Sequence, residues 1–318
     1  MDSFKEDRTS GSARVANAFL SGLRRWIATD TSRSAADLRG RLLAWLRDAQ
    51  AAQPTMALVH QLSARALEVA DTGLSRGDSP PDLRRSLEES CEAEARDIEA
   101  SGHAIARRAL ELLGERGAWI ATLSHSAAVR DALLAAALAG RAPRVLIAES
   151  RPLYEGRVVA RALAARGIEV WLVVDAALPL LISQARMVWL GADAVTELGV
   201  VNKVGSYAAA LAAREHSVPV YALASRRKFL PATGALQILE MSPAEVWDAP
   251  AQGVKPRNVY FETVPLPLLR GVVVEDAVLP PGEAAQLARE RPLPEALAMI
   301  EPVTASRPSA PTPRGRPA

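Results

Sequence analysis

The chain has 318 residues, of which 49% are hydrophobic and 23% are charged, and its formal net charge is +2. A chain of this length buries a large core and has room for two domains, and the composition is that of a globular protein. The low net charge and the scattered arginines argue against a protein that binds nucleic acid directly. A single cysteine, Cys91, allows no internal disulfide and fits a reducing, cytoplasmic setting.

Residues 1–13 are polar and charged and lack the apolar core of a secretory signal, so we expect a flexible N-terminus without a leader. From residue 14 to residue 116, apolar side chains recur at three- and four-residue spacing, which predicts a domain of amphipathic helices. The last two of these helices begin beside proline with serine or threonine, as helix starts commonly do. The predicted helices cover residues 14–28, 36–50, 53–70 and 79–113.

Beyond Gly117 the pattern changes to short, almost wholly apolar segments that alternate with helical ones. This alternation predicts right-handed crossovers and a mainly parallel sheet that is covered on both faces. We therefore expect an α/β fold, with a second domain over residues 117–302. The predicted strands lie at 118–123, 144–149, 168–174, 187–192 and 218–224, with a further candidate at 270–276.

Two other segments bear on the organisation of the chain. The most apolar stretch, residues 168–183, is interrupted by Asp175 and Pro179. No apolar run reaches membrane-spanning length, so we expect no membrane segment. Residues 303–318 are rich in proline and lack core residues, and we expect a disordered tail there.

Polar residues follow the predicted strands at the points where the strands end. Ligands of open parallel sheets bind beyond the carboxyl ends of the strands, so these residues are candidates for a binding site. As an alternative, strand ends are polar simply because they are exposed to solvent. This alternative explains any single residue, but it explains less well why a carboxylate follows each of three apolar strands. The residues are Thr122, Ser124, His125, Ser126, Glu149, Ser150, Arg151, Asp175, Asp193, Ser225, Arg226, Arg227 and Lys228.

The segment 191–212 has the features of an anion site. Its predicted helix starts near Ser206, and a helix N-terminus offers free N–H groups to a phosphate. Lys203 adds a positive charge, which we expect to be exposed to solvent, and Asn202 adds hydrogen-bond donors. A plain turn with a capping serine explains the same residues equally well. Arg151 is a second candidate for holding a phosphate or carboxylate, with a surface salt bridge as its alternative.

Other reactive side chains give weaker indications. Ser124 and His125 are conceivable as a hydrolase pair with His125 as the base, but the segment lacks the flanking glycines of a nucleophile elbow. The other histidines show no metal-ligand spacing, and neither a P-loop nor a dinucleotide fingerprint occurs, so we expect neither a metal nor a cofactor. Cys91 lies in the long charged helix, where we expect a structural role.

Six segments together resemble one superfamily of proteins. It contains 5-methylthioribose-1-phosphate isomerase, ribose-1,5-bisphosphate isomerase and the alpha, beta and delta subunits of translation initiation factor 2B. The resemblance covers roughly residues 50–280 and implies a helical N-terminal domain, a Rossmann-like second domain and a dimer. The segments are QPTMALVHQL, TLSHSAAV, ESRPLYEGR, GIEVWLVVDAA, GADAVTELGVVNKVGSYAAALAA, and SPAEVW followed by NVYFETVPLPLL.

The resemblance also implies roles for individual residues. In the isomerases the catalytic pair is an aspartate and a cysteine; the aspartate corresponds to Asp193, and Ser124 stands at the cysteine position. A thiol with a lowered pKa ionises near neutrality, whereas a serine hydroxyl needs a strong base. The phosphate-contacting asparagine and lysine correspond to Asn202 and Lys203. Gln53 stands where the phosphate loop of the isomerases carries an arginine.

Two functions remain open. The first, which we favour, is an aldose–ketose isomerase for a phosphorylated pentose of the ribose-1,5-bisphosphate or methylthioribose-1-phosphate type. Asp193 would be its acid–base group, and Ser124, together with His125, would replace the thiol. The second is a non-catalytic regulatory subunit, similar to those of initiation factor 2B, that senses a phosphorylated sugar or nucleotide-derived metabolite; loss of the cysteine favours it. In both cases we expect ligand contacts from Ser126 and Arg151 and a cytoplasmic homodimer or higher oligomer.

Overall fold

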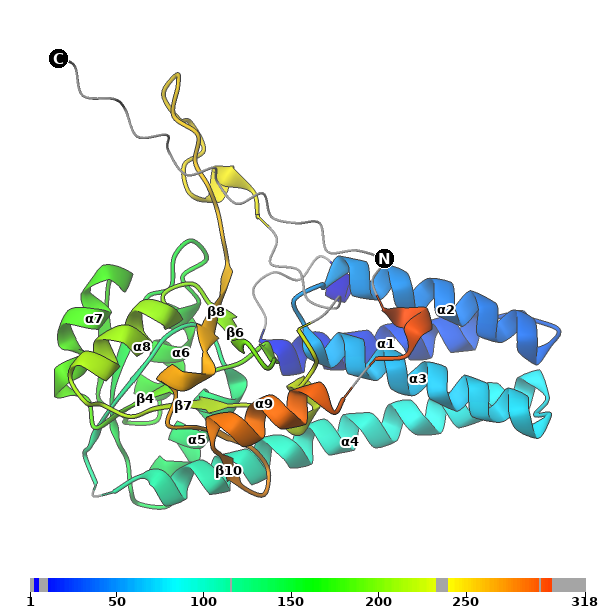
Figure 1. The fold of residues 1–318 in the computed structure, drawn as a ribbon, viewed down its shortest axis with the longest axis horizontal. Coiled ribbons are helices and arrows are strands. Elements are labelled where there is room, and N and C mark those ends of the chain that lie inside the picture. The colour runs from blue at the N-terminus through cyan, green and yellow to red at the C-terminus, as the bar shows by residue number, and fades with distance from the viewer. Residues whose placement is uncertain (1–2, 6–10, 115, 233–239, 292, 299–318) are drawn as a thin grey trace, which may run out of the picture.

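The computed structural model describes residues 3–5, 11–114, 116–232, 240–291 and 293–298, and the tail expected at 303–318 lies outside them. The chain forms a helical part and a sheet part that lie side by side (Figure 1). The helical part begins with a 3-10 turn at Ser3–Lys5. Its helices are α1 (Ser12–Thr29), α2 (Ala35–Ala52), α3 (Ala57–Arg76) and α4 (Pro80–Leu112).

The long helix α4 joins the two parts. Its N-cap Ser79 accepts a hydrogen bond from the N–H of Asp82 (3.4 Å), and proline occupies its first turn. Cys91, in its first half, packs in the core of the helical part, and burial raises the pKa of that thiol to about 12, which fits a structural role. Ile105, in its second half, packs against the sheet. Helix α4 thus contributes side chains to both cores and ends shortly before the domain boundary expected at residue 116. The division into two domains stays a prediction.

The N-terminal segment contributes to the helical core. Phe4 is fully buried, and its ring lies 5.6 Å from that of Phe19 and 6.0 Å from that of Trp45. Helix α1 begins at Ser12, two residues before the expected start. Residues 3–5 therefore pack on the helical core, because an aromatic ring buried among other rings holds its own segment in place, and flexibility of residues 1–13 as a whole stays a prediction.

Within the described residues the main sheet has seven strands in the order β10-β9-β7-β4-β1-β2-β3, and all neighbouring strands are parallel except the pair β9 and β10. It confirms the predicted α/β fold with a mainly parallel sheet. The strands are β1 (Trp119–Thr122), β2 (Arg144–Ala148), β3 (Val170–Val173), β4 (Met187–Leu190), β7 (Val220–Leu223), β9 (Gly271–Val273) and β10 (Val278–Leu279).

Helices cover both faces of the inner strands of this sheet, which explains why those strands are almost wholly apolar. Val145 and Ile147 of β2 face a core shared with α4, α5 and α6, while Leu146 and Ala148 face a core shared with α7, α8 and α9. These helices are α5 (Ala127–Leu138), α6 (Glu155–Ala164), α7 (Leu178–Leu181), α8 (Ser206–Glu215) and α9 (Pro281–Arg289).

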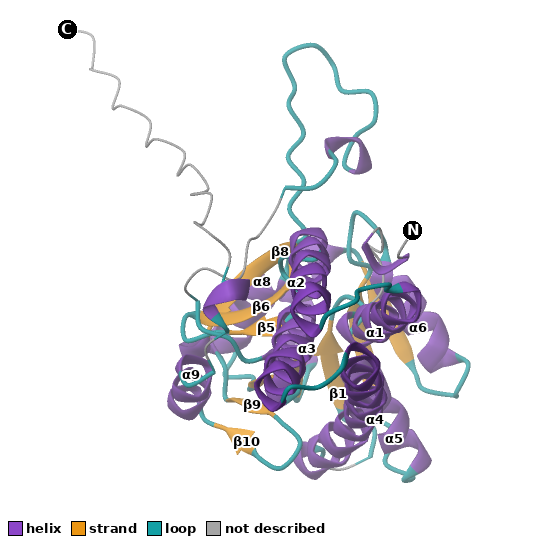
Figure 2. Cartoon of the chain, turned by 90° about the vertical axis from the view of Figure 1, so that its right-hand side faces the viewer, coloured by secondary structure: helices purple, strands orange, loops and turns teal. Residues whose placement is uncertain are grey.

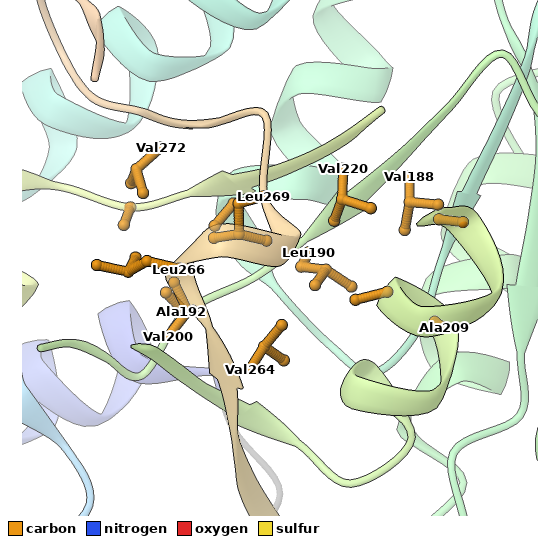
Figure 3. Packing of buried hydrophobic residues seen from close by; sticks show 14 of the residues in the cluster. Val188, Leu190, Ala192, Val200, Ala209, Val220, Val264, Leu266, Leu269 and Val272 are labelled. Carbon is orange, nitrogen blue, oxygen red and sulfur yellow. The ribbon is translucent and has the colours of Figure 1, made fainter. Parts of the chain in front are cut away.

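A second, antiparallel sheet was not predicted. It consists of β5 (Ala194–Val195), β6 (Gly199–Lys203) and β8 (Phe261–Pro265). Residues 199–203, for which an anion site and a plain turn were both left open, therefore form a buried strand before α8. Val200 and Val264 of this sheet lie in one apolar cluster with Leu190 and Ala192 (Figure 3). This packing fixes the chain that leaves β4 and enters β5, where Asp193 lies.

Residues 240–258 form an arm that stands off the body of the molecule before β8 begins (Figure 2). An ion pair between Arg257 and Glu240 and a bridge between Glu240 and Val259 close its base. The arm returns to the body where Val246 O accepts a hydrogen bond from Arg151 (3.3 Å). Within the described ranges, no helix combines the length and apolarity that a membrane crossing requires.

Candidate functional site

A small cavity of about 40 Å³ lies at the carboxyl edge of the main sheet, where the small sheet and the start of α1 meet it. Six of the seven predicted site residues line it, and Arg151 does not. Glu155, which was not predicted, lines it too. The lining consists of Gly11, Ser12, Met56, Ser124, His125, Ser126, Glu155, Ala192, Asp193, Asn202, Lys203 and Phe261.

The turn after β1 is shaped by two serines in left-handed backbone conformations. Ser124 has a φ of 66° and Ser150 has a φ of 64°. The N–H of Ser124 donates to the hydroxyl of Ser150 (2.7 Å), which ties the end of β1 to the end of β2. Ser126 then caps α5 by accepting a hydrogen bond from the N–H of Val129 (3.4 Å). These bonds explain why hydroxyl residues cluster here, and they leave the Ser124 hydroxyl without a partner among the described residues.

Asp193 is held by its backbone between the two sheets. Its N–H donates to Val201 O (2.8 Å), and its carbonyl accepts from the N–H of Ala57 (3.1 Å). The carboxylate is partly exposed to the cavity and forms no hydrogen bond within the described chain. Burial raises the pKa of Asp193 to about 6 against the opposing charges of Lys228 and Lys203, and the Glu155 carboxylate adds to the rise. A carboxyl group with this pKa both donates and accepts protons near neutral pH.

Lys228 supports Asp193 from behind the cavity. Its Nζ donates to Ala192 O (2.6 Å), one residue before Asp193, and the side chain is buried. Burial lowers the pKa of Lys228, while Asp193 and Glu275 oppose that change. The sequence placed Lys228 at a strand end, but its position beside Asp193 depends on the packing of β7 against β4.

Lys203 is buried, which corrects the expectation that it is exposed. Its side chain is 2% exposed because β6 is an inner strand of the small sheet. Its Nζ lies 2.7 Å from Oε1 of Glu155 and 4.4 Å from the centre of the Tyr260 ring. Asn202, its neighbour, donates to the Ser206 hydroxyl (2.9 Å) at the start of α8. The amide and the lysine therefore line the cavity, but the lysine charge is already paired.

Two glycines, Gly191 and Gly156, allow helices α5 and α6 to pack closely against the strands beside the cavity. A Cβ on Gly191 would lie 2.6 Å from Cβ of Ser126, so a larger residue would push the start of α5 away from β4. A Cβ on Gly156 would lie 1.9 Å from Ala148 O, which fixes the first turn of α6 against β2. Glu155 begins that turn, so its position follows from the same contact.

Arg151 points away from the cavity. Its guanidinium group donates to the Tyr154 hydroxyl (2.6 Å) and to Val246 O in the arm. The Asp175 carboxylate accepts hydrogen bonds from the N–H groups of Ser150 and Arg151 (2.8 Å each), so it shapes the turn after β2. Asp175 and Arg151 therefore have structural roles: Asp175 stabilises the turn after β2, and Arg151 binds the arm.

Two further residues from the sequence lie away from the cavity. Gln53 donates to Phe4 O (2.6 Å), so the residue at the arginine position of the isomerases anchors the N-terminal segment. His60 is fully buried with Nε2 3.2 Å from Pro54 O, and burial lowers its pKa to about 4. Within the described part of the chain, no group of histidine, cysteine or carboxylate side chains is arranged to hold a metal ion.

The fold and the cavity define an α/β protein with a polar pocket at the carboxyl edge of its sheet. The chain belongs to the Initiation factor 2 subunit family, whose model matches residues 8–281. This places it in the superfamily that its segments resemble.

Individual relatives carry different names. The chain is 37% identical over 171 residues to a putative translation initiation factor eIF-2B subunit 2-like protein of Pyrococcus furiosus. The matched stretch covers 52% of this chain and 60% of that protein. It is 33% identical over 199 residues to the ribose 1,5-bisphosphate isomerase of Archaeoglobus fulgidus, and this match covers 58% of this chain and 63% of that protein. The matches thus span less than two thirds of each of these relatives.

Solved structures agree on the fold. The eIF-2B structure of Pyrococcus horikoshii is similar with a TM-score of 0.75 and 26% identity, over 88% of this chain and 94% of that chain. The 5-methylthioribose 1-phosphate isomerase of the same organism is similar with a TM-score of 0.69 over 91% and 85% of the two chains. Its identity of 19% shows a shared fold alone.

Proposed function

We propose that the protein is an aldose–ketose isomerase that binds and acts on a phosphorylated pentose. Relatives named as sugar-phosphate isomerases support an isomerase function in this broad sense. The observation that carries the proposal is Asp193, a carboxyl group with a pKa of about 6 on the wall of a cavity lined by hydroxyl and amide groups. General acid–base groups work best when their pKa lies near the operating pH.

In this proposal Asp193 moves protons on the sugar oxygens while the carbonyl group shifts between neighbouring carbons. The Ser124 hydroxyl lies on the same cavity and makes no hydrogen bond to a described residue, so it is available to a sugar oxygen. It cannot supply a thiolate, and His125 on the same wall is the nearest chain neighbour that could act as a base. Asn202 and Lys203 contact the oxygen atoms of the ligand.

The phosphate group is proposed to bind at the Gly11 end of the cavity. Helix α1 begins there with Gly11 as its N-cap, and no side chain of the described residues caps it, so the N–H groups of Ser12 and Ala13 can donate to an anion, while that of Arg14 bonds to Gly11 O (2.9 Å). Ser12 and His125 line the same end, and both also line an adjoining groove of about 680 Å³. A phosphate therefore has room there that the inner cavity does not offer.

A second function is a regulatory subunit that binds the ligand without converting it. Ser124 at the position of the family cysteine favours it, as does the relative named as an eIF-2B subunit 2-like protein. The two functions share the pocket and differ in turnover alone. Action in the cytoplasm belongs to both proposals and rests on the single, buried Cys91.

A homodimer is part of the same proposal. Strand β3 is an edge of the main sheet, and it exposes Trp171 (44%) and Leu172 (46%), with Val174 (59%) just beyond its end. An apolar edge strand left open to water is prone to pair with another chain. We propose that a second copy covers it.

Ligand binding is tested by thermal denaturation with pentose phosphates and with the free pentoses. At about a hundred times its dissociation constant, a ligand of the native state adds roughly 2.7 kcal/mol of stability. We expect phosphorylated pentoses to raise the melting temperature and free pentoses to leave it unchanged. Equal responses to both sets would reject a phosphate site. Product analysis by NMR on each stabilising compound then separates the isomerase from the regulatory subunit.

A further inference from the structure

The inner wall of the cavity carries a buried ion pair that the proposed reaction does not require. Lys203 and Glu155 have side chains that are 2% and 9% exposed, and Nζ and Oε1 are 2.7 Å apart. Both residues line the cavity, so the pair faces any ligand that enters. Because the lysine charge is neutralised, this wall offers no excess positive charge to a phosphate.

The second oxygen of Glu155 is the unusual feature of this wall. Oε2 is buried and has no hydrogen-bond partner within the described chain. A buried acceptor without a partner destabilises the folded state, and more so when it is charged. The ion pair of Oε1 with Lys203 (2.7 Å) holds the Glu155 carboxylate in the wall, and the close contact of Gly156 with Ala148 O fixes the backbone from which this side chain starts. The oxygen is therefore fixed at the cavity and needs a donor from the ligand.

A sugar hydroxyl supplies such a donor, and a phosphate does not. A phosphate beside Lys203 would be close to the Glu155 carboxylate on the same wall and to Asp193 in the same small cavity. Like charges placed together in a site of low polarity repel strongly, whereas a hydroxyl donates to the carboxylate and accepts from the lysine.

We infer that Glu155 determines which ligand the cavity accepts: beside Lys203 it takes a neutral hydroxyl group and rejects a second phosphate. The ligand is then a pentose with one phosphate, bound at the Gly11 end, and not a pentose bisphosphate. This inference rests on the proposed function, because it needs a sugar phosphate in the cavity. It replaces the phosphate contact that the resemblance implies for Asn202 and Lys203.

The test compares three probes in titration calorimetry: ribose 1-phosphate, ribose 5-phosphate and ribose 1,5-bisphosphate. We expect the wild-type protein to bind one of the monophosphates at least about tenfold more tightly than the bisphosphate. Glu155→Gln keeps the shape of the side chain, removes its charge and frees the charge of Lys203. In this variant we expect the ratio of the two dissociation constants to shift at least about tenfold toward the bisphosphate.

A matched control is Glu149→Gln. Glu149 pairs with Arg157 (2.5 Å) beside the same turn, but it does not line the cavity, so the ratio should stay at its wild-type value. If Glu155→Gln fails to fold because Lys203 loses its partner, the uncharged pair Glu155→Gln with Lys203→Met is used. In this double variant the ratio should still shift toward the bisphosphate relative to the wild type, because the Glu155 charge that repels a second phosphate is gone.

The outcomes separate the two proposals. A wild-type protein that binds the bisphosphate as tightly as a monophosphate, or a ratio unchanged by Glu155→Gln, overturns the role of Glu155 and leaves the proposed function standing. If neither these three probes nor 5-methylthioribose 1-phosphate binds either protein, the proposed function fails, and this inference fails with it.

Discussion

The ammonium group of Lys203 and the carboxylate of Glu155 form an ion pair of 2.7 Å in the wall of the cavity, although 48 residues separate them in the chain. The pair joins β6 of the small sheet to the first turn of α6 beside the main sheet. The same two residues therefore hold the sheets together and face the ligand, so changes to them affect stability and binding at once.

Lys203→Ala should destabilise the unliganded protein. Breaking a buried ion pair by removing one partner typically costs about 3–5 kcal/mol, because the remaining charge stays buried. We expect a clear fall in the urea midpoint of unfolding. Lys255→Ala is the matched control, since Lys255 is exposed on the arm and its loss should leave the midpoint unchanged. Equal midpoints for both variants would mean that Lys203 is not buried as described.

Asp193→Asn should stabilise the folded protein in a way that depends on pH. The folded protein holds the Asp193 proton up to pH about 6, whereas the unfolded chain releases it near 3.8, so ionisation disfavours the folded state as pH rises between these values. The substitution removes at most about 3 kcal/mol of this cost above pH 6 and none below pH 4.

Urea unfolding at pH 4 and pH 7 measures this gain. Asp175→Asn serves as the control, because its carboxylate accepts two backbone hydrogen bonds and its loss should lower stability at pH 7. A loss of stability in Asp193→Asn at pH 7 would show that the carboxylate is stabilised by its surroundings, contrary to the arrangement described here.

Ser124→Cys should increase isomerase activity, or create it if the wild-type protein only binds its ligand. Thiol and hydroxyl are close in size, and the left-handed backbone at Ser124 stays as it is because the N–H bond to Ser150 is kept. A thiol ionises more readily than a hydroxyl and is a stronger acid–base group near neutrality. Steady-state kinetics of this variant beside Ser124→Ala decides the matter. Full activity in Ser124→Ala would remove this hydroxyl from the mechanism and direct attention to His125.

Substitution of the exposed β3 edge should dissociate the proposed dimer. The rings of Trp171 and Trp119 pack against each other, tilted by 51° with their centres 4.4 Å apart, so Leu172 is the better target. We expect sedimentation velocity to show a dimer for the wild type and a monomer for Leu172→Lys. Leu138→Lys is the control, because Leu138 is 82% exposed at the end of α5, away from the edge strand. A wild type that sediments as a monomer would contradict the proposal.

Much of the fold could be predicted because it depends on local pattern. All five strands predicted from apolar runs occur, the candidate at 270–276 contains β9, and α8 begins at Ser206 as expected. The small sheet was missed because its pairing partners, Gly199–Lys203 and Phe261–Pro265, are far apart in the chain. A short strand that pairs at such a distance has no signal in its own periodicity.

The sequence predicted which residues line the candidate site, but not which of them contact one another. The rule that ligands lie beyond the carboxyl ends of strands placed Ser124, His125 and Asp193 together. It could not show that Glu155 neutralises Lys203, since that contact joins the end of strand β6 in the small sheet to the first residue of helix α6, which packs on the main sheet. Nor could it show that Arg151 points to the arm, because an arginine side chain is long enough to reach either way.

The central claim is that Asp193 carries out acid–base chemistry on a phosphorylated pentose. The most direct measurement is NMR of the products formed from ribose 1-phosphate, ribose 5-phosphate, ribose 1,5-bisphosphate and 5-methylthioribose 1-phosphate, with wild-type protein and with Asp193→Asn. We predict that the wild type converts at least one of them to its ketose phosphate, and that Asp193→Asn does so at least about a hundredfold more slowly with binding largely kept. Equal turnover by the two proteins, or no conversion of any of the four by the wild type, would contradict the account.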